Sequence, residues 1–99
     1  MSSRNQRLTP QHRAAATCII AGLRTAAASF AAGERDPARL RDLAAQPVIE
    51  EPQARLEYLE VVDPSTLEPL ETDADVAMIV AAVWFGPVRL IDNIGLGIS

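Results

Sequence analysis

The sequence predicts an α+β fold in which two helices pack on a small three-stranded antiparallel sheet. Three observations support this prediction. An alanine-rich stretch with helical periodicity opens the chain, a segment with a period of two begins after Pro52, and a run of β-forming residues ends in Gly-Pro. Helices therefore come first and strands follow, which is typical of a sheet covered by helices.

The first helix is expected between Thr9 and Gly33. The hydroxyl of Thr9 can cap free amides, and Pro10 suits the first helical position. Gly33 supplies the left-handed residue that commonly ends a helix. One face carries apolar residues three or four positions apart: Ala15, Ile19, Leu23, Ala26 and Phe30.

A second, shorter helix is expected after Asp36 and Pro37, which repeat the start signal. Pro47 is expected to stop this helix, because proline lacks the amide that a helix interior needs. Its buried stripe is formed by Leu40, Leu43 and Ala44.

A half-buried strand is expected between Pro52 and Pro64, with Leu56 and Tyr58 alternating with Glu57 and Leu59. The glutamates of "EYLE" and "LEPLE" are interpreted as solvated surface. Residues 76–85, "VAMIVAAVWF", are rich in β-formers and predict a central strand that is buried on both faces. Gly86 and Pro87 end it, and "VRLIDNIGL" is expected to be its hairpin partner.

The composition indicates one small globular domain and disfavours several functions. The chain has 99 residues, of which 48% are hydrophobic and 22% charged. Its net charge of −4 repels nucleic acid. All nine basic residues are arginines, which excludes a Schiff-base lysine or a phosphate-loop lysine from these residues. Any anion bound here would need arginine or backbone donors.

Neither a metal centre nor a membrane segment is expected. The only soft metal ligands, His12 and Cys18, lie six positions apart on the first predicted helix and therefore mostly on different faces. The longest apolar run is too short to cross a bilayer, and we see no export leader. A lone cysteine beside apolar residues fits the cytoplasm best.

Two clusters have structural explanations that we favour over ligand binding. Arg35, Arg39 and Arg41 alternate with acidic residues, which is typical of a solvated face laced with ion pairs. Trp84 could stack on an adenine, but its place in an apolar strand favours a role in the core. The opening "SSRN" offers two hydroxyls and a guanidinium that suit phosphate oxygens, although short Ser/Arg segments are common.

Four separated blocks of the chain carry a family resemblance. In order and spacing, "MSSRNQRLTPQHR", "AGERD", "YLEVVDPSTLEPL" and "VRLIDNI" resemble the C-terminal domain of the pantothenate synthetase (pantoate–β-alanine ligase) family. The resemblance extends from Met1 to about Leu96. It implies a two-domain enzyme whose N-terminal nucleotide-binding domain, of the class I aminoacyl-tRNA synthetase type, is absent from these residues.

The resemblance implies an ATP-dependent, AMP-forming acid–amine ligase. In the family, the carboxylate of pantoate attacks the α-phosphate of ATP, pyrophosphate leaves, and the amine of β-alanine displaces AMP from the pantoyl adenylate. Mg²⁺ accompanies the nucleotide. The complete enzyme is expected to be a homodimer, and the 99 residues alone are expected to be inactive, with no catalytic or metal-binding residue of their own.

The same resemblance assigns roles to the two parts of the chain. Residues 1–8 would form a segment between domains similar to the mobile KMSKS loop, and residues 9–99 a lid over the ATP site. Met1 would contact the adenine side of ATP. Ser2, Ser3 and Arg4 would hold its phosphate oxygens. A different class of function also stays open, namely a stand-alone α+β module that binds another protein.

Overall fold

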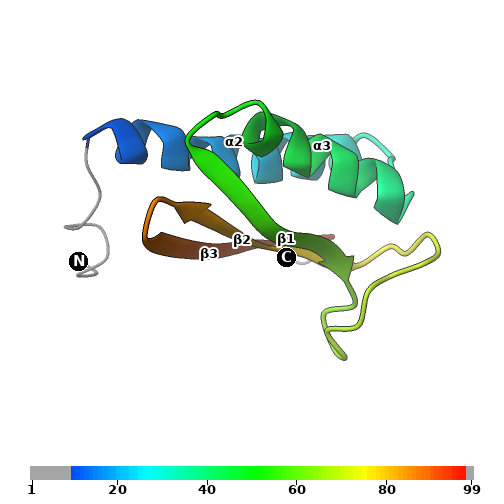
Figure 1. Ribbon diagram of the computed structural model, residues 1–99. Helices are drawn as coiled ribbons and strands as arrows, with labels where there is room; N and C mark the ends of the chain where they lie inside the picture. The colour runs from blue at the N-terminus through cyan, green and yellow to red at the C-terminus, as the bar shows by residue number, and fades with distance from the viewer. Residues whose placement is uncertain (1–9, 98–99) are drawn as a thin grey trace.

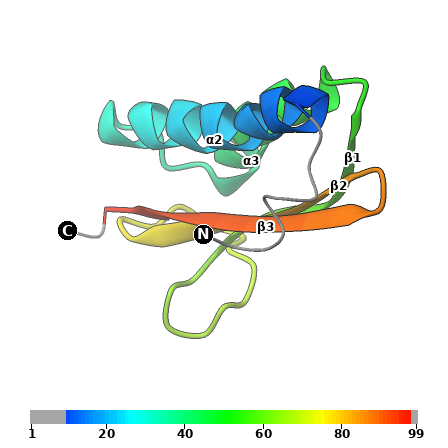
Figure 2. The same ribbon diagram turned by 90° about the vertical axis from the view of Figure 1, so that its left-hand side faces the viewer.

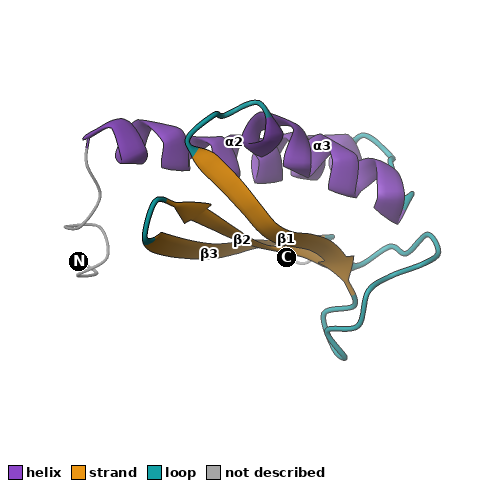
Figure 3. Ribbon diagram, in the orientation of Figure 1, coloured by secondary structure: helices purple, strands orange, loops and turns teal. Residues whose placement is uncertain are grey.

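The computed structural model describes residues 10–97, which form two layers (Figure 1). Both helices lie on one face of a three-stranded antiparallel sheet with the strand order β1-β2-β3 (Figures 2 and 3). The predicted α+β architecture is therefore confirmed. In chain order the elements are α2 (Pro10–Ala31), α3 (Pro37–Ile49), β1 (Ala54–Val62), β2 (Ala77–Phe85) and β3 (Val88–Leu96).

The predicted helix starts are confirmed. Helix α2 begins at Pro10 and ends two residues before Gly33, which has a positive φ of 117°. Asp36 caps α3, because its carboxylate accepts a hydrogen bond of 3.1 Å from the amide of Ala38. Pro37 occupies the first turn of α3.

The predicted end of α3 at Pro47 is wrong, because the helix continues through the proline to Ile49. Val48 lies one position beyond Pro47 and is only 1% exposed, so continuing the helix buries an apolar side chain. The amide of Glu50 closes the last turn by donating to the carbonyl of Gln46 at 3.1 Å. Burial and this hydrogen bond offset the amide that proline lacks.

The two helices approach each other closely at Gly22. A Cβ built at this position would collide with the backbone carbonyl oxygen of Ala44 in α3. Because that carbonyl belongs to a helix backbone, it has little freedom to move away. Glycine therefore sets the distance between α2 and α3.

Strand β1 contains a β-bulge that changes which side chains face the helices. Leu56 pairs with Val83 and Tyr58 with Ala82, so Glu57 is an extra residue in β1. Leu56 and Leu59 consequently both face the core, and Leu59 is only 1% exposed. The predicted alternation, with Leu56 and Leu59 on opposite faces, is wrong for this reason.

Strand β2 is central, as predicted, but only its helix-facing side is buried throughout. That side carries Ala77, Ile79, Ala81, Val83 and Phe85, each at most 1% exposed. On the opposite side, Met78, Val80 and Trp84 are half-buried. A sheet with helices on one face leaves its other face open. The predicted hairpin is confirmed, with Gly86 at a positive φ of 61° in the turn.

The carboxylate of Glu57 ties the three strands together on the outer face of the sheet, the one opposite the helices. It accepts two hydrogen bonds from the Arg89 guanidinium, at 2.7 and 2.9 Å, and one from the indole Nε1 of Trp84 at 2.7 Å. These hydrogen bonds lower the pKa of Glu57, with Arg89 as the main cause.

We expect Gly22→Ala to destabilise the chain. The added methyl group meets the Ala44 carbonyl, and overpacking of this kind costs ~1–3 kcal/mol, against a gain in helix propensity of about 1 kcal/mol. Urea unfolding followed by circular dichroism measures the difference. The control is Ala21→Ser, which adds one atom at an exposed neighbouring site. An alanine variant as stable as the parent would contradict the close approach.

The contribution of Glu57 to stability should depend on pH. Because folding lowers the pKa of Glu57, its stabilising effect is present above the pKa of an unfolded glutamate, about 4.3, and disappears as the pH falls through the lower folded value. The Tm of Glu57→Gln should therefore fall below that of the parent at about pH 7 and converge with it in acid. Arg24→Gln, at an exposed position on α2, controls for the loss of a surface charge. A Tm difference that stays constant into acid would contradict the ion pair.

Candidate functional site

The residues with predicted ATP contacts, Met1, Ser2, Ser3 and Arg4, lie outside the described residues, so their contacts stay predictions. The described chain shows where this segment is attached. Helix α2 begins at the end of the domain that also holds the turn between β2 and β3 (Figures 1 and 2). Arg4 is six residues from Pro10, and six extended residues span at most about 20 Å.

Near this turn, aromatic and charged side chains gather on the outer face of the sheet. We call Arg55, Glu57, Tyr58, Trp84 and Arg89 the outer-face cluster. The Arg55 guanidinium lies 5.8 Å from the centroid of the Trp84 ring, and that of Arg89 lies 6.0 Å from the Tyr58 ring. Cross-strand pairing of Arg55 with Trp84, and of Trp84 with Arg89, brings the three strands' side chains together.

Trp84 corrects a prediction, because it is half-buried on the outer face and does not belong to the core. Its neighbours Val83 and Phe85 occupy the core face, and alternation along β2 directs Trp84 the other way. Its indole N–H donates to Glu57, which satisfies the polar atom of a ring that is partly removed from water.

Sequence reasoning missed the outer-face cluster as a unit. The sequence pattern indicates only that Glu57 is solvated. In the structure, its exposed carboxylate accepts hydrogen bonds from Trp84 and Arg89. The available signal was a pair of opposite charges, Glu57 and Arg89, on strands expected to share one sheet. The bulge in β1 places Glu57 within hydrogen-bonding distance of Trp84 and Arg89. The alternation of residues along the sequence does not reveal this bulge.

The outer-face cluster carries a net positive charge. Glu57 and Arg89 neutralise each other through paired hydrogen bonds. Glu57 raises the pKa of Arg89, so this pair stays ionised at neutral pH. Arg55 lies over Trp84, and among residues 10–97 we find no carboxylate within ion-pair distance of it. The cluster thus presents one cation beside aromatic surface.

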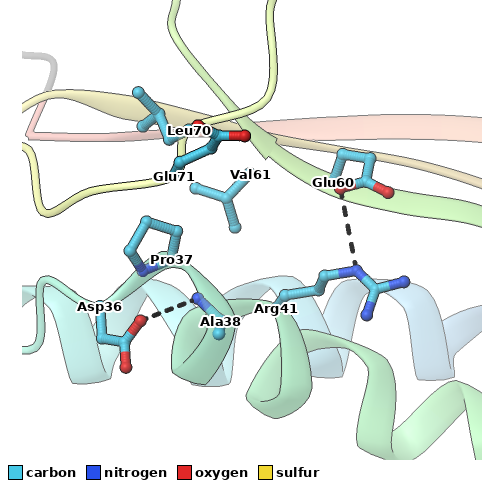
Figure 4. A pocket seen from close by; sticks show the side chains of 8 residues that line it. All are labelled: Asp36, Pro37, Ala38, Arg41, Glu60, Val61, Leu70 and Glu71. Carbon is cyan, nitrogen blue, oxygen red and sulfur yellow. Dashed lines mark hydrogen bonds and ion pairs between the residues drawn. The ribbon is translucent and has the colours of Figure 1, made fainter.

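A pocket of about 250 Å³ lies between the start of α3 and β1 (Figure 4). Arg41 reaches across it, donating to the Leu59 carbonyl at 2.8 Å and lying 3.9 Å from the Glu60 carboxylate. The amide of Ala38 is already bonded to Asp36 and so does not serve an external anion. The other lining residues are Pro37, Val61, Leu70 and Glu71.

The predicted solvated arginine face is correct for Arg39, whose exposed guanidinium lies 3.3 Å from Glu34. Arg35 and Arg41 instead connect different elements. Arg35 packs 3.9 Å from the centroid of Phe30 in α2 and lies 3.3 Å from Asp75 in the segment before β2. The guanidinium groups of these two arginines therefore already have partners within the protein.

Other candidate chemistry in the described residues is limited. Cys18 is half-buried, and burial, followed by the charge of Glu51, raises its pKa, which disfavours a reactive thiolate. Among residues 10–97 we find no cluster of three metal-ligating side chains. Within the same range, no helix is both long and apolar enough to span a membrane.

Comparison with known proteins gives a consistent result. The family model described as pantoate-beta-alanine ligase matches residues 1–95. The chain is 43% identical over 99 residues to the pantoate--beta-alanine ligase of Arabidopsis thaliana, covering 32% of that protein. It is 47% identical over 94 residues to the pantothenate synthetase of Chloroflexus aurantiacus, covering 34% of it.

The fold agrees with these similarities. The crystal structure of pantothenate synthetase from Thermus thermophilus superimposes with a TM-score of 0.85 at 31% identity, over 95% of this chain and 34% of that one. The chain therefore spans about a third of the length of the relatives it matches. On the family match, the sequence identities and the shared fold, the chain belongs to the pantoate-beta-alanine ligase family.

Proposed function

We propose that this chain is the ATP-loop segment and C-terminal lid domain of a ligase that joins pantoate to β-alanine using ATP. Residues 1–8 are the loop and residues 9–99 the lid. The observation that carries the proposal is the family match over residues 1–95, which includes "SSRN", in a chain only about a third as long as its relatives. The nucleotide-binding domain then belongs to the remaining part of the ligase.

The reaction proceeds in two displacements. A carboxylate oxygen of pantoate bonds to the α-phosphorus of ATP, and the bond to pyrophosphate breaks. The amine of β-alanine then attacks the acyl carbon of the pantoyl adenylate, loses a proton as the amide forms, and displaces AMP. Negative charge develops on the departing pyrophosphate in the first step.

Ser2, Ser3 and Arg4 supply donors that suit this developing charge. Two hydroxyls and a guanidinium bond phosphate oxygens, and donors placed around the leaving group stabilise the transition state more than bound ATP. Met1 contacts the adenine side. This donor set holds no carboxylate for a metal, so Mg²⁺, which neutralises phosphate charge when bound, is held with the nucleotide by the rest of the ligase.

Residues 9–99 act as a rigid lid that carries the loop. Closure of a lid excludes water that would hydrolyse an acyl adenylate. The tightly packed two-layer core supports this role, because it lets the domain move as one body. Contacts to pantoate and β-alanine belong to the other part of the ligase, which we propose is a cytoplasmic homodimer.

The alternative function is a stand-alone module that binds another protein. The half-exposed aromatic residues of the outer-face cluster are the observation that favours it. The gene distinguishes the two functions, since a ligase requires a nucleotide-binding domain encoded with or beside these residues.

Arg4→Ala in the complete ligase should lower the rate of pantothenate formation. Removing one donor to a charge that develops in the transition state typically costs ~10²- to 10³-fold in kcat. Steady-state release of AMP measures the effect, and Arg24→Ala, on the exposed side of α2, is the matched control. Turnover and ATP affinity that are unchanged in Arg4→Ala would contradict the role of the loop.

The isolated chain should form no pantothenate from pantoate, β-alanine and Mg-ATP, because it holds only part of the proposed site. Adding or fusing the nucleotide-binding domain should restore activity. Mass spectrometry of the product follows both reactions, and the nucleotide-binding domain alone is the control. Pantothenate formation by the isolated chain would show that the proposed division of roles is wrong.

A further inference from the structure

We propose that the outer-face cluster, together with Ile91, is the surface on which the nucleotide-binding part of the ligase packs. The inference rests on the proposed function, because it takes its partner to be the part that presents ATP. Three independent features of the molecule support it: the point at which the loop is attached, the side chains available on each layer, and the charges already paired within the cluster.

The attachment of the loop restricts where the partner lies. The backbone of Arg4 lies within about 20 Å of Pro10, the span of six extended residues, and a phosphate held by Arg4 lies farther out only by the length of the arginine side chain. Helix α2 has 22 residues and is therefore about 33 Å long, so its other end is out of reach. The partner must approach the end of the domain that holds the β2–β3 turn (Figure 1), and Trp84 and Arg89 of the outer-face cluster lie next to this turn.

The two layers offer different surfaces at this end. The described solvent side of α2 at this end presents Arg13, Thr17 and Ile20, and Ile20, 45% exposed, is the single large apolar side chain among them. The outer face of the sheet presents Tyr58, Trp84 and Ile91, the last of them 51% exposed. Aromatic residues and arginine are enriched in interface cores, so the outer face is the better docking surface.

The charges of the outer-face cluster are arranged for contact with a partner. Glu57 already pairs with Arg89 and accepts the Trp84 N–H, so covering these groups leaves the carboxylate and the indole N–H with their hydrogen bonds. Arg55 lies over Trp84 and keeps a positive charge that these residues do not balance. The partner surface is therefore apolar, with one carboxylate placed opposite Arg55.

Cysteine labelling in the complete ligase tests this surface. Ile91→Cys and Ala28→Cys are made in a Cys18→Ala background, and peptide mass spectrometry follows their alkylation by a maleimide. The thiol introduced by Ile91→Cys on the outer face should react at least tenfold more slowly than the control thiol on α2, and more slowly still with Mg-ATP. Equal rates at the two positions, with and without Mg-ATP, would overturn the proposal.

A charge reversal provides a second test that does not depend on the cysteine variants. Arg55→Glu should raise the KM for ATP about tenfold, whereas Arg55→Lys should restore it and Arg24→Glu should leave it unchanged. If Arg55→Glu keeps the parent's KM for ATP, the proposal that a carboxylate of the partner faces Arg55 is overturned.

If Arg4→Ala is inactive but both tests fail, the proposed function stands and this surface is wrong. If the introduced thiol is protected but Arg4→Ala is fully active, the surface stands and the role of the loop is wrong.

Discussion

One extra residue in β1 determines which side chains of this strand lie on each face of the sheet. Glu57 has no partner in the pairing of β1 with β2, so the alternation of side chains shifts between Leu56 and Tyr58. On the helix side, this shift lets Leu56 and Leu59 share the core. On the outer side, the extra residue reaches Trp84 and Arg89 with its carboxylate. A regular strand would send Leu56 and Leu59 to opposite faces, at a cost of ~1.5–3 kcal/mol for each large apolar side chain left in water.

Within the helical layer, the contacts are of a different kind. Gly22 lets the backbone of α2 approach the Ala44 carbonyl, so the helices touch through backbone rather than through long side chains. At the far end, Arg35 stacks on Phe30 and donates to its carbonyl at 2.6 Å, which joins the end of α2 to the following turn. Close packing at one point and directed hydrogen bonds at another restrict sliding of the helices. The core cluster shared by helices and strands then joins the two layers into one packed body, which the proposed loop-carrying role would require.

The sequence predicted where helices and strands occur better than it predicted which side chains of each strand face the helices. Helix starts at Pro10 and Pro37 were predictable because capping residues and proline act locally. The end of α3 was not, since the burial of Val48 that outweighs Pro47 depends on packing in the core shared by the helices and the sheet. Trp84 was misplaced because an apolar run does not show which of its faces meets the helices. The outer-face cluster depends on the bulge at Glu57, which only the pairing with β2 defines. The family resemblance was visible in short blocks of residues, because such blocks keep their order whatever the register.

The positions of these features explain how this small domain would contribute to the proposed ligase. A lid must be stiff, must hold its loop at one end, and must meet its partner at that same end, because a contact elsewhere would not control the loop. The core lies between the helices and the sheet. The hydrogen bonds from Trp84 and Arg89 to Glu57 join the three strands at the end of the domain where α2 begins. The outer face combines the Glu57–Arg89 pair with half-exposed aromatic rings, so in the proposed lid it would contact water when the lid is open and protein when it is closed. Such a surface suits a contact that forms and breaks in every catalytic cycle, since interfaces of moving domains are more polar than permanent ones.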